Sequence, residues 1–184
     1  MNERVVTVGI GEYAEAVSPD ILAVYGLGSC VALVLNEPVL GWAGLAHILL
    51  PGPRASSDRD FKLPAKYADG ALEVLLLSLE QKGGNASRLE AGIVGGARLF
   101  HSDTPLDNSI GERNVSGVVK CLRAKGVPVV WMDIGGTIGR SLRYHPGEGI
   151  LLVRTLREEG WQEVARLDAP SNPAEAGPEP GQNS

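Results

Sequence analysis

The sequence predicts a mixed α/β domain of the α+β type, with a largely antiparallel sheet and two main helices. Short apolar runs bounded by glycine, proline and asparagine recur along the chain and outnumber the segments with helical spacing. At two places such runs are separated by turns of a few residues, which join antiparallel neighbours into hairpins. The helical segments interrupt these hairpins, and this order is typical of an antiparallel sheet with helices added to it.

Two short strands are expected near the N-terminus. Residues 5–10 read as a strand that bends at its glycines, and residues 21–25 read as a second strand. Residues 14–20, between them, are expected to form a loop. These strands lead directly into the most apolar part of the chain.

Residues 30–35 and 44–50 are apolar runs separated by the turn signal NEP, and they predict an antiparallel hairpin. With the turn centred directly after Pro38, Cys30 lies opposite His47, and opposed Cβ atoms are about 5 Å apart. A slip of one residue would put the two side chains on different faces. The sequence therefore permits a thiol beside an imidazole on one face of the hairpin.

A thiol beside an imidazole is a candidate nucleophile, because the ring can take the thiol proton and leave a thiolate–imidazolium pair. Gly28 and Ser29 directly precede Cys30. They allow a tight bend, and amide N–H groups there would stabilise an oxyanion. The alternative is that Cys30 is an ordinary core residue and His47 a hydrogen-bonded structural one. The residue types alone leave both interpretations open.

Helices are expected at residues 65–82 and 112–125, where apolar side chains recur at helical spacing. Ser109 offers an N-terminal cap for the second. The polar residues 52–64 lack periodicity and connect the His47 strand to the first helix. They form either a lid over the site or an ordinary connection.

The remaining strands are expected at residues 89–97, 127–134, 140–144 and 150–155, and the last two form a second hairpin. The first of these contains a pair of glycines, which can bring its backbone close to another chain or to a substrate. The three histidines are scattered, and no CxxC or HExxH spacing occurs. The sequence therefore predicts no metal site.

Composition limits the class of protein and of partner. The chain has 184 residues, 43% of them hydrophobic, and a net charge of −5. The negative charge argues against a nucleic-acid partner, and no apolar run approaches the ~20 residues of a membrane span. Two cysteines far apart in the sequence do not suggest a disulfide scaffold, so a reducing cytoplasm fits best.

One folded domain is expected at residues 1–167. From residue 168 onward the chain contains four prolines and several acidic residues but no lysine or arginine. Such a composition cannot bury a core, so residues 168–184 are expected to be a disordered tail.

The segments that carry Cys30 and His47, GLGSCVALVL and GLAHILLP, resemble the CheD family of chemoreceptor glutamine deamidases. The likeness continues in order along residues 5–164, through the motifs GIGEY, KYAD, GGA, IGERNV, GG and RS. No single motif is specific, but their number and order are. The resemblance implies a layered sandwich like the catalytic domain of deamidating bacterial toxins.

The resemblance also implies a reaction. Cys30 would attack the carboxamide carbon of a glutamine on a cytoplasmic helix of a chemotaxis receptor, and His47 would move the protons. Water would then release glutamate from the thioester, with no cofactor. The region of Phe100 is associated in this family with contacts to receptor-like helices and to the CheC phosphatase, although Phe100 could equally be a core residue.

At one position the chain departs from the family pattern. Family members can carry a threonine six residues before the cysteine as the third member of a triad, and here that position is Val24. A backbone carbonyl, a water or a hydroxyl such as that of Thr7 or Thr137 would have to orient His47 instead. The alternative function is therefore a receptor-binding or CheC-binding module with little turnover. An unrelated thiol hydrolase acting on small amides is a third reading.

Overall fold

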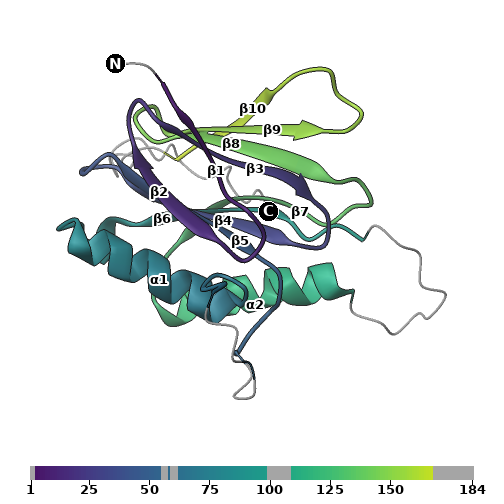
Figure 1. Ribbon diagram of the computed structural model, residues 1–184, viewed down its shortest axis with the longest axis horizontal. Coiled ribbons are helices and arrows are strands. Elements are labelled where there is room, and N and C mark those ends of the chain that lie inside the picture. Colours follow the sequence, from purple (N-terminus) through teal and green to yellow (C-terminus); the bar gives the residue numbers. More distant parts are fainter. Residues whose placement is uncertain (1–2, 55–57, 59–61, 99–108, 168–184) are drawn as a thin grey trace, which may run out of the picture.

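The computed structural model describes residues 3–54, 58, 62–98 and 109–167, and these form three layers. Two five-stranded sheets pack face to face, and two α-helices cover the outer face of the second sheet (Figure 1). Within the described strands, two pairs of neighbours are parallel, Val5–Thr7 (β1) with Ile21–Leu27 (β3) and Glu90–Gly95 (β6) with Val129–Ile134 (β7), and all others are antiparallel. The expected α+β sandwich with largely antiparallel sheets is confirmed.

The first sheet contains, in spatial order, β1 (Val5–Thr7), β3 (Ile21–Leu27), β8 (Arg140–His145), β9 (Ile150–Thr155) and β10 (Gln162–Arg166). The second sheet contains β2 (Tyr13–Val17), β5 (Trp42–Ile48), β4 (Val31–Glu37), β6 (Glu90–Gly95) and β7 (Val129–Ile134). The helices are α1 (Ala68–Gln81) and α2 (Ile110–Ala124), with a short 3₁₀ helix at Ala86–Arg88.

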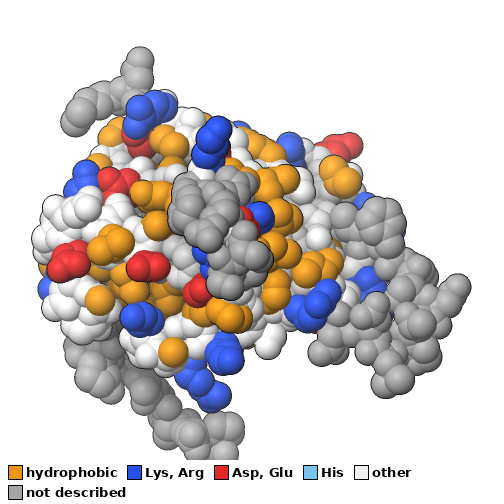
Figure 2. All heavy atoms as spheres, turned by 60° about the horizontal axis from the view of Figure 1, so that its bottom comes forward, with side chains coloured by type: hydrophobic (Ala, Val, Ile, Leu, Met, Phe, Trp, Pro, Cys, Tyr) orange, Lys and Arg blue, Asp and Glu red, His pale blue; other side chains and the backbone are white. Residues whose placement is uncertain are grey.

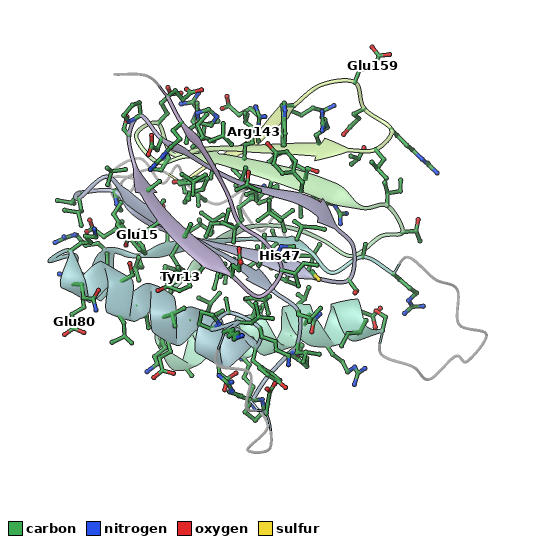
Figure 3. All side chains as sticks on the ribbon, in the orientation of Figure 1. Tyr13, Glu15, His47, Glu80, Arg143 and Glu159 are labelled. Atoms are coloured by element: carbon green, nitrogen blue, oxygen red, sulfur yellow. The ribbon has the colours of Figure 1, made fainter. Side chains whose placement is uncertain are left out.

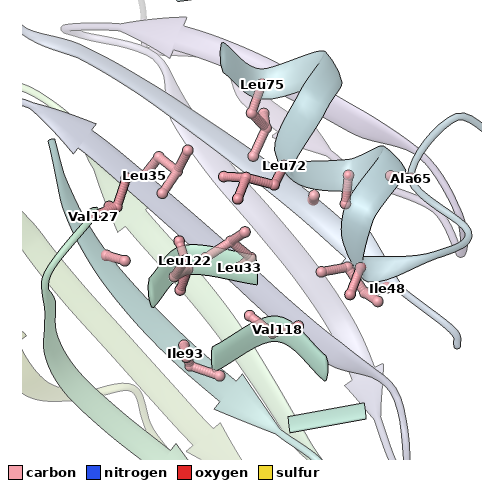
Figure 4. Close-up of a cluster of buried hydrophobic side chains, with 14 of the residues drawn as sticks. Leu33, Leu35, Ile48, Ala65, Leu72, Leu75, Ile93, Val118, Leu122 and Val127 are labelled. Atoms are coloured by element: carbon pink, nitrogen blue, oxygen red, sulfur yellow. The ribbon is translucent and has the colours of Figure 1, made fainter. Parts of the chain in front are cut away.

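Strand β4 lies at the centre of the molecule, and all seven of its residues are buried. One face of the strand points to the helices and the other to the first sheet, so both faces are apolar and the sequence shows no alternation. The helix-facing core contains Leu33 and Leu35 of β4 with Leu72, Leu75, Val118 and Leu122 of the helices (Figure 4). The core between the sheets contains Ala32 and Val34 of β4.

Helix α2 begins at a capping box, as the sequence predicted for Ser109. The Ser109 hydroxyl accepts a hydrogen bond from the Glu112 N–H, and the Glu112 carboxylate accepts one from the Ser109 N–H, both at 3.2 Å. The cap fixes where the helix starts, and therefore which of its residues face the sheet.

Two strands were missed by the sequence analysis. Residues 14–17 do not belong to a loop, because β2 pairs with β5 from Tyr13↔Ala46 to Val17↔Trp42, and the loop before β3 is limited to residues 18–20. Strand β10 was not expected, and it pairs with β9 through a bulge near Glu163. Both are edge strands, and pairing with a neighbour gives them a conformation that their alanine and glutamate residues favour weakly.

Some expectations lie outside the described residues. Phe100 and the tail at residues 168–184 belong to this group, and so does part of the segment at 52–64. Within the described residues, no helix is long and apolar enough to cross a membrane.

Candidate functional site

The register of β4 against β5 sets the position of His47. His47 lies directly opposite Ala32, and Val31 lies opposite Ile48. The expected register, with Cys30 opposite His47, is therefore wrong by two residues. A shift of two keeps each side chain on its face, because the side chains of a strand alternate with a period of two.

The turn explains the shift. Glu37 stays in the ladder opposite Trp42, so the loop consists of residues 38–41 and is closed by Gly41 at φ 65°. The buried Glu37 carboxylate accepts a hydrogen bond from the Leu40 N–H and forms an ion pair with Arg88. These contacts hold the end of β4 in the strand, two residues beyond the point where the sequence pattern stops it.

Cys30 and His47 still share one face of the hairpin. Ala32, opposite His47, belongs to the core between the two sheets, and Cys30 packs against that same core. Figure 3 shows His47 near the centre of the molecule, between the two sheets. Arg143, on β8 of the first sheet, marks the other side of this space. Cys30 lies two residues before Ala32, so it is a diagonal neighbour of His47, a relationship that separates Cβ atoms by about 7 Å.

The backbone before Cys30 is held by three consecutive carbonyl hydrogen bonds. The Gly28 carbonyl accepts from the Ala97 N–H at 2.8 Å, and the Cys30 carbonyl accepts from the Gly96 N–H at 2.8 Å. Between them, the Ser29 carbonyl accepts from the side-chain amide of Asn114 at 2.9 Å. The segment is therefore fixed to β6 on one side and to α2 on the other.

The glycine pair Gly95-Gly96 makes this close approach possible. Both glycines have positive φ, at 115° and 66°. A Cβ atom on Gly95 would overlap the carbonyl oxygen of Cys30. These glycines do admit a close backbone, but the neighbour is the Cys30 segment of the same chain rather than the other chain or substrate that the sequence suggested.

His47 is 3% exposed, and the turn before β2 closes over its strand. The backbone N–H of His47 donates to the Glu12 carbonyl at 3.0 Å, and the backbone carbonyl of His47 accepts from the Gly11 N–H at 2.8 Å. Among the described residues, neither ring nitrogen has a hydrogen-bond partner of standard geometry. The backbone of Val8 and the charge of Glu12 both favour the protonated ring.

The two hydroxyls that the sequence offered for orienting the His47 ring, those of Thr7 and Thr137, do not take that role. Thr7 and Thr137 are both exposed. Val24 is fully buried in the core between the sheets, on β3. Of the alternatives for orienting His47, the backbone carbonyl of Val8 is the one with an interaction in the structure.

Burial gives the two side chains opposite shifts. It raises the pKa of Cys30, and the cysteine's own backbone N–H offsets this in part. It lowers the pKa of His47, against the opposing effects of the Val8 backbone and Glu12. Each group is therefore favoured in its neutral form, and the resting pair is a thiol with a neutral imidazole rather than the ion pair.

A hollow of about 180 Å³ adjoins the Cys30 segment, with a lining that includes Gly26, Gly28, Arg140, Ser141 and Arg154. A larger cavity of about 600 Å³ lies between α1 and α2. The helical side of the molecule carries hydrophobic side chains interspersed with charged ones (Figure 2). The lining of this cavity includes Cys121 but neither Cys30 nor His47. Within the described ranges, no group of three or more His, Cys, Asp or Glu side chains is placed to hold a metal ion.

The sequence analysis assigned no role to Val8, Glu12 or Asn114. Glu12 and Asn114 lie in the motifs GIGEY and IGERNV, which carried the family resemblance. A signal for Asn114 was present, since a polar residue midway between Gly111 and Gly117 on a helix suggests a close backbone contact. Its partners cannot be read from the sequence.

The chain is similar to known proteins over most of its length. Residues 49–155 match the family model described as CheD chemotactic sensory transduction. The chain is 40% identical over 157 residues to the probable chemoreceptor glutamine deamidase CheD of Caldanaerobacter subterraneus subsp. tengcongensis, which covers 85% of this chain and 96% of that protein.

The chain is also 41% identical over 147 residues to the chemoreceptor glutamine deamidase CheD of Thermotoga maritima, covering 80% of this chain and 89% of that protein. For the protein of the same name from Halalkalibacterium halodurans, the identity is 39% over 159 residues, or 86% and 97% of the two chains. The family model begins to match at residue 49, directly after the His47 strand. On these matches, the chain belongs to the CheD family.

Proposed function

We propose that this protein is a chemoreceptor glutamine deamidase, which hydrolyses the side-chain carboxamide of glutamines on cytoplasmic receptor helices. The names of the relatives support the proposed activity. The proposed mechanism is supported by a half-buried thiol and a buried imidazole that lie on one face of the hairpin. The names favour an enzyme over a binding module. We further propose Cys30 as the nucleophile and His47 as the acid and base.

The first half of the reaction forms a thioester. His47 takes the proton of the Cys30 thiol while the sulfur attacks the carboxamide carbon, because the neutral resting pair requires that the proton move during attack. The carbonyl oxygen becomes an oxyanion, which the N–H groups of Ser29 and Cys30 stabilise. The intermediate collapses, the C–N bond breaks, and the imidazolium gives its proton to the departing ammonia.

The second half is hydrolysis of that thioester. His47 takes a proton from water, the resulting hydroxide attacks the carbonyl carbon, and the C–S bond breaks. The sulfur leaves with the proton from His47, which restores the thiol, and the product is a glutamate. Each turnover consumes one water, releases one ammonia and adds one negative charge to the receptor helix, with no cofactor in the proposal.

The geometry of the backbone supports the proposed oxyanion site. Hydrogen bonds to the carbonyls of Gly28 and Ser29 fix the two peptide planes whose N–H groups, those of Ser29 and Cys30, the mechanism uses. Preorganised donors of this kind need no rearrangement as charge develops. The hollow of about 180 Å³ is lined by Gly28, two residues before the proposed nucleophile, and offers room for a substrate side chain on that side of the loop.

The proposed substrate also indicates the compartment in which the enzyme acts. The substrate is the cytoplasmic part of a methyl-accepting receptor, so we propose that the enzyme acts in the cytoplasm. We also propose a contact with a CheC-type phosphatase in the region of Phe100.

Mass spectrometry of receptor fragments tests the proposal. Purified cytoplasmic fragments are incubated with the native protein, with Cys30→Ala and with Cys121→Ala. Each deamidation adds about 1 Da, because OH replaces NH₂ at the acyl carbon. Modification by the native protein and by Cys121→Ala, but not by Cys30→Ala, supports it. The absence of any modification, with receptor binding intact, would favour the binding module.

A further inference from the structure

Asn114 lies where the two halves of the candidate site meet. It is 0% exposed, on α2. Its side-chain amide donates to the Ser29 carbonyl and to the Leu49 carbonyl, both at 2.9 Å. Ser29 directly precedes Cys30, and Leu49 comes two residues after His47. One side chain therefore ties the start of the Cys30 strand to the end of the His47 strand.

The identity of the side chain is constrained by these partners. Both neighbours are carbonyl oxygens, so the group that faces them must supply two hydrogens, and a primary amide does so. The Asn114 Oδ1 atom is buried without a hydrogen-bond partner among the described residues. An unpaired buried oxygen costs about 1–3 kcal/mol. The fold tolerates that cost in order to keep a double donor at this place.

Two glycines bring the helix within reach. Gly111, Asn114 and Gly117 recur every three residues, so they lie on one side of α2. A Cβ atom on Gly111 would overlap the Gly96 carbonyl, and one on Gly117 would overlap the Pro51 carbonyl. The helix backbone therefore touches the two segments that follow β6 and β5, and the short Asn114 side chain can span between them.

The bond to Ser29 has a consequence for the next peptide plane. The Ser29–Cys30 peptide is trans, since the cis bonds of the described chain are at Pro19 and Pro53. In a trans peptide the C=O and N–H point in opposite directions. By holding the Ser29 carbonyl toward α2, Asn114 turns the Cys30 N–H away from the helix. That N–H lowers the pKa of the Cys30 thiol and so offsets part of the effect of burial, which means that its direction affects the proposed nucleophile.

We propose that Asn114 is a positioning residue, which aims the Cys30 N–H at the oxyanion and holds the end of the His47 strand. This inference rests on the proposed deamidase function. It extends that function because Asn114 touches neither substrate nor the reacting atoms, and acts through two backbone carbonyls. Its loss is therefore expected to slow the chemical step and to leave substrate binding nearly unchanged.

The chain offers a matched control in Asn36. This residue is also a buried asparagine; its amide donates to the Leu167 carbonyl at 2.7 Å, and its Oδ1 is likewise buried without a partner in the described chain. It lies at the other end of β4, six residues from Cys30 and about 20 Å along the strand. Asn36→Ala therefore removes a comparable structural bond far from the site.

The experiment compares the full-length native protein with Asn114→Ala and Asn36→Ala in two assays. The first is deamidation of a receptor fragment, where we expect Asn114→Ala to lower kcat roughly 10- to 100-fold with KM within about twofold. The second is alkylation of Cys30 by iodoacetamide at pH 8, followed on its peptide by mass spectrometry. Here Asn114→Ala is expected to react more slowly, because the N–H that favours the thiolate is released. Asn36→Ala is expected to stay within about twofold in both.

The outcomes separate the two proposals. If the native protein deamidates no receptor fragment, the proposed function fails, and the alkylation assay alone decides on Asn114. Equal effects of the two asparagine variants, or an Asn114→Ala variant with native kcat and native alkylation, would overturn the positioning role. If Asn114→Ala does not fold, Asn114→Asp keeps the shape. Its alkylation rate relative to the native protein should recover as pH falls, because a protonated carboxyl again donates a hydrogen; a constant ratio would contradict the inference.

Discussion

Ala32 is the cross-strand partner of His47, and its methyl group is the side chain that stands directly beside the imidazole on the face between the sheets. Opposed Cβ atoms are about 5 Å apart, so a larger residue at this position would meet the ring. With alanine at this position, only a methyl group faces the ring from the opposite strand, and the diagonal neighbour on the same face is Cys30. This relationship leads to the first prediction.

Ala32→Val is expected to lower kcat at least about tenfold, because the added methyl groups crowd the ring that we propose as the acid and base. The matched control is Ala43→Val. Ala43 is equally buried, lies in the same core and pairs with Asn36 at the far end of the hairpin. Both variants overpack the core at a cost of about 1–3 kcal/mol. Deamidation kinetics and thermal melts would show equal losses of stability but unequal losses of kcat; equal kcat values would contradict the argument.

The pH dependence of stability is expected to report the burial of His47. Burial lowers the pKa of the folded imidazole below its ordinary 6.5. Below that value the unfolded chain binds more protons than the folded one, so the free energy of unfolding falls as pH drops from 6.5 toward the folded pKa. Above 6.5 the contribution is fully present. Denaturant unfolding at a series of pH values measures it, with His47→Gln as the variant that lacks it.

The difference between the native protein and His47→Gln is the quantity that matters, because other groups also titrate. That difference should shift between pH 6.5 and the folded pKa, and stay constant above pH 7. A difference that does not change with pH would mean that His47 is not buried as a neutral ring.

Gly117→Ala is expected to destabilise the fold, although alanine is the better helix former by about 1 kcal/mol. The new Cβ would overlap the Pro51 carbonyl, so α2 must move away from the sheet. That movement would loosen the two bonds of Asn114 and slow alkylation of Cys30. Gly160→Ala is the control, because nothing lies within 4 Å of its new Cβ. A native melting temperature for Gly117→Ala would show that the helix does not need this contact.

Which parts of the site were predictable follows from the range of the interactions. The prediction that Cys30 and His47 share a face needed only the alternation of strand side chains. It remained correct although the predicted register was wrong by two residues. The register itself depends on Glu37, whose partner Arg88 is 51 residues away. Asn114 could not be assigned for the same reason, since its carbonyl partners are 85 and 65 residues distant. Strand β2 was missed because only its pairing with β5 makes it a strand.

The last prediction concerns Val24, which occupies the position where the family resemblance places a threonine. The side chain is fully buried between the sheets, and neither His47 ring nitrogen has a standard hydrogen-bond partner in the described chain. Val24→Thr is expected to raise kcat by about 3- to 30-fold, because its hydroxyl supplies an orienting bond to the ring. This gain is a fraction of the ~10⁴-fold that an orienting carboxylate supplies in one triad enzyme.

Val34→Thr is the control for burying a hydroxyl in that core. Val34 is also fully buried between the sheets, on β4. An unpaired hydroxyl there costs about 1–3 kcal/mol. Val24→Thr should lose less stability than this, since His47 offers a partner, and it alone should gain activity. If both variants lose the same stability and neither gains kcat, the hydroxyl does not reach the ring, and the Val8 carbonyl is left as the group that orients His47.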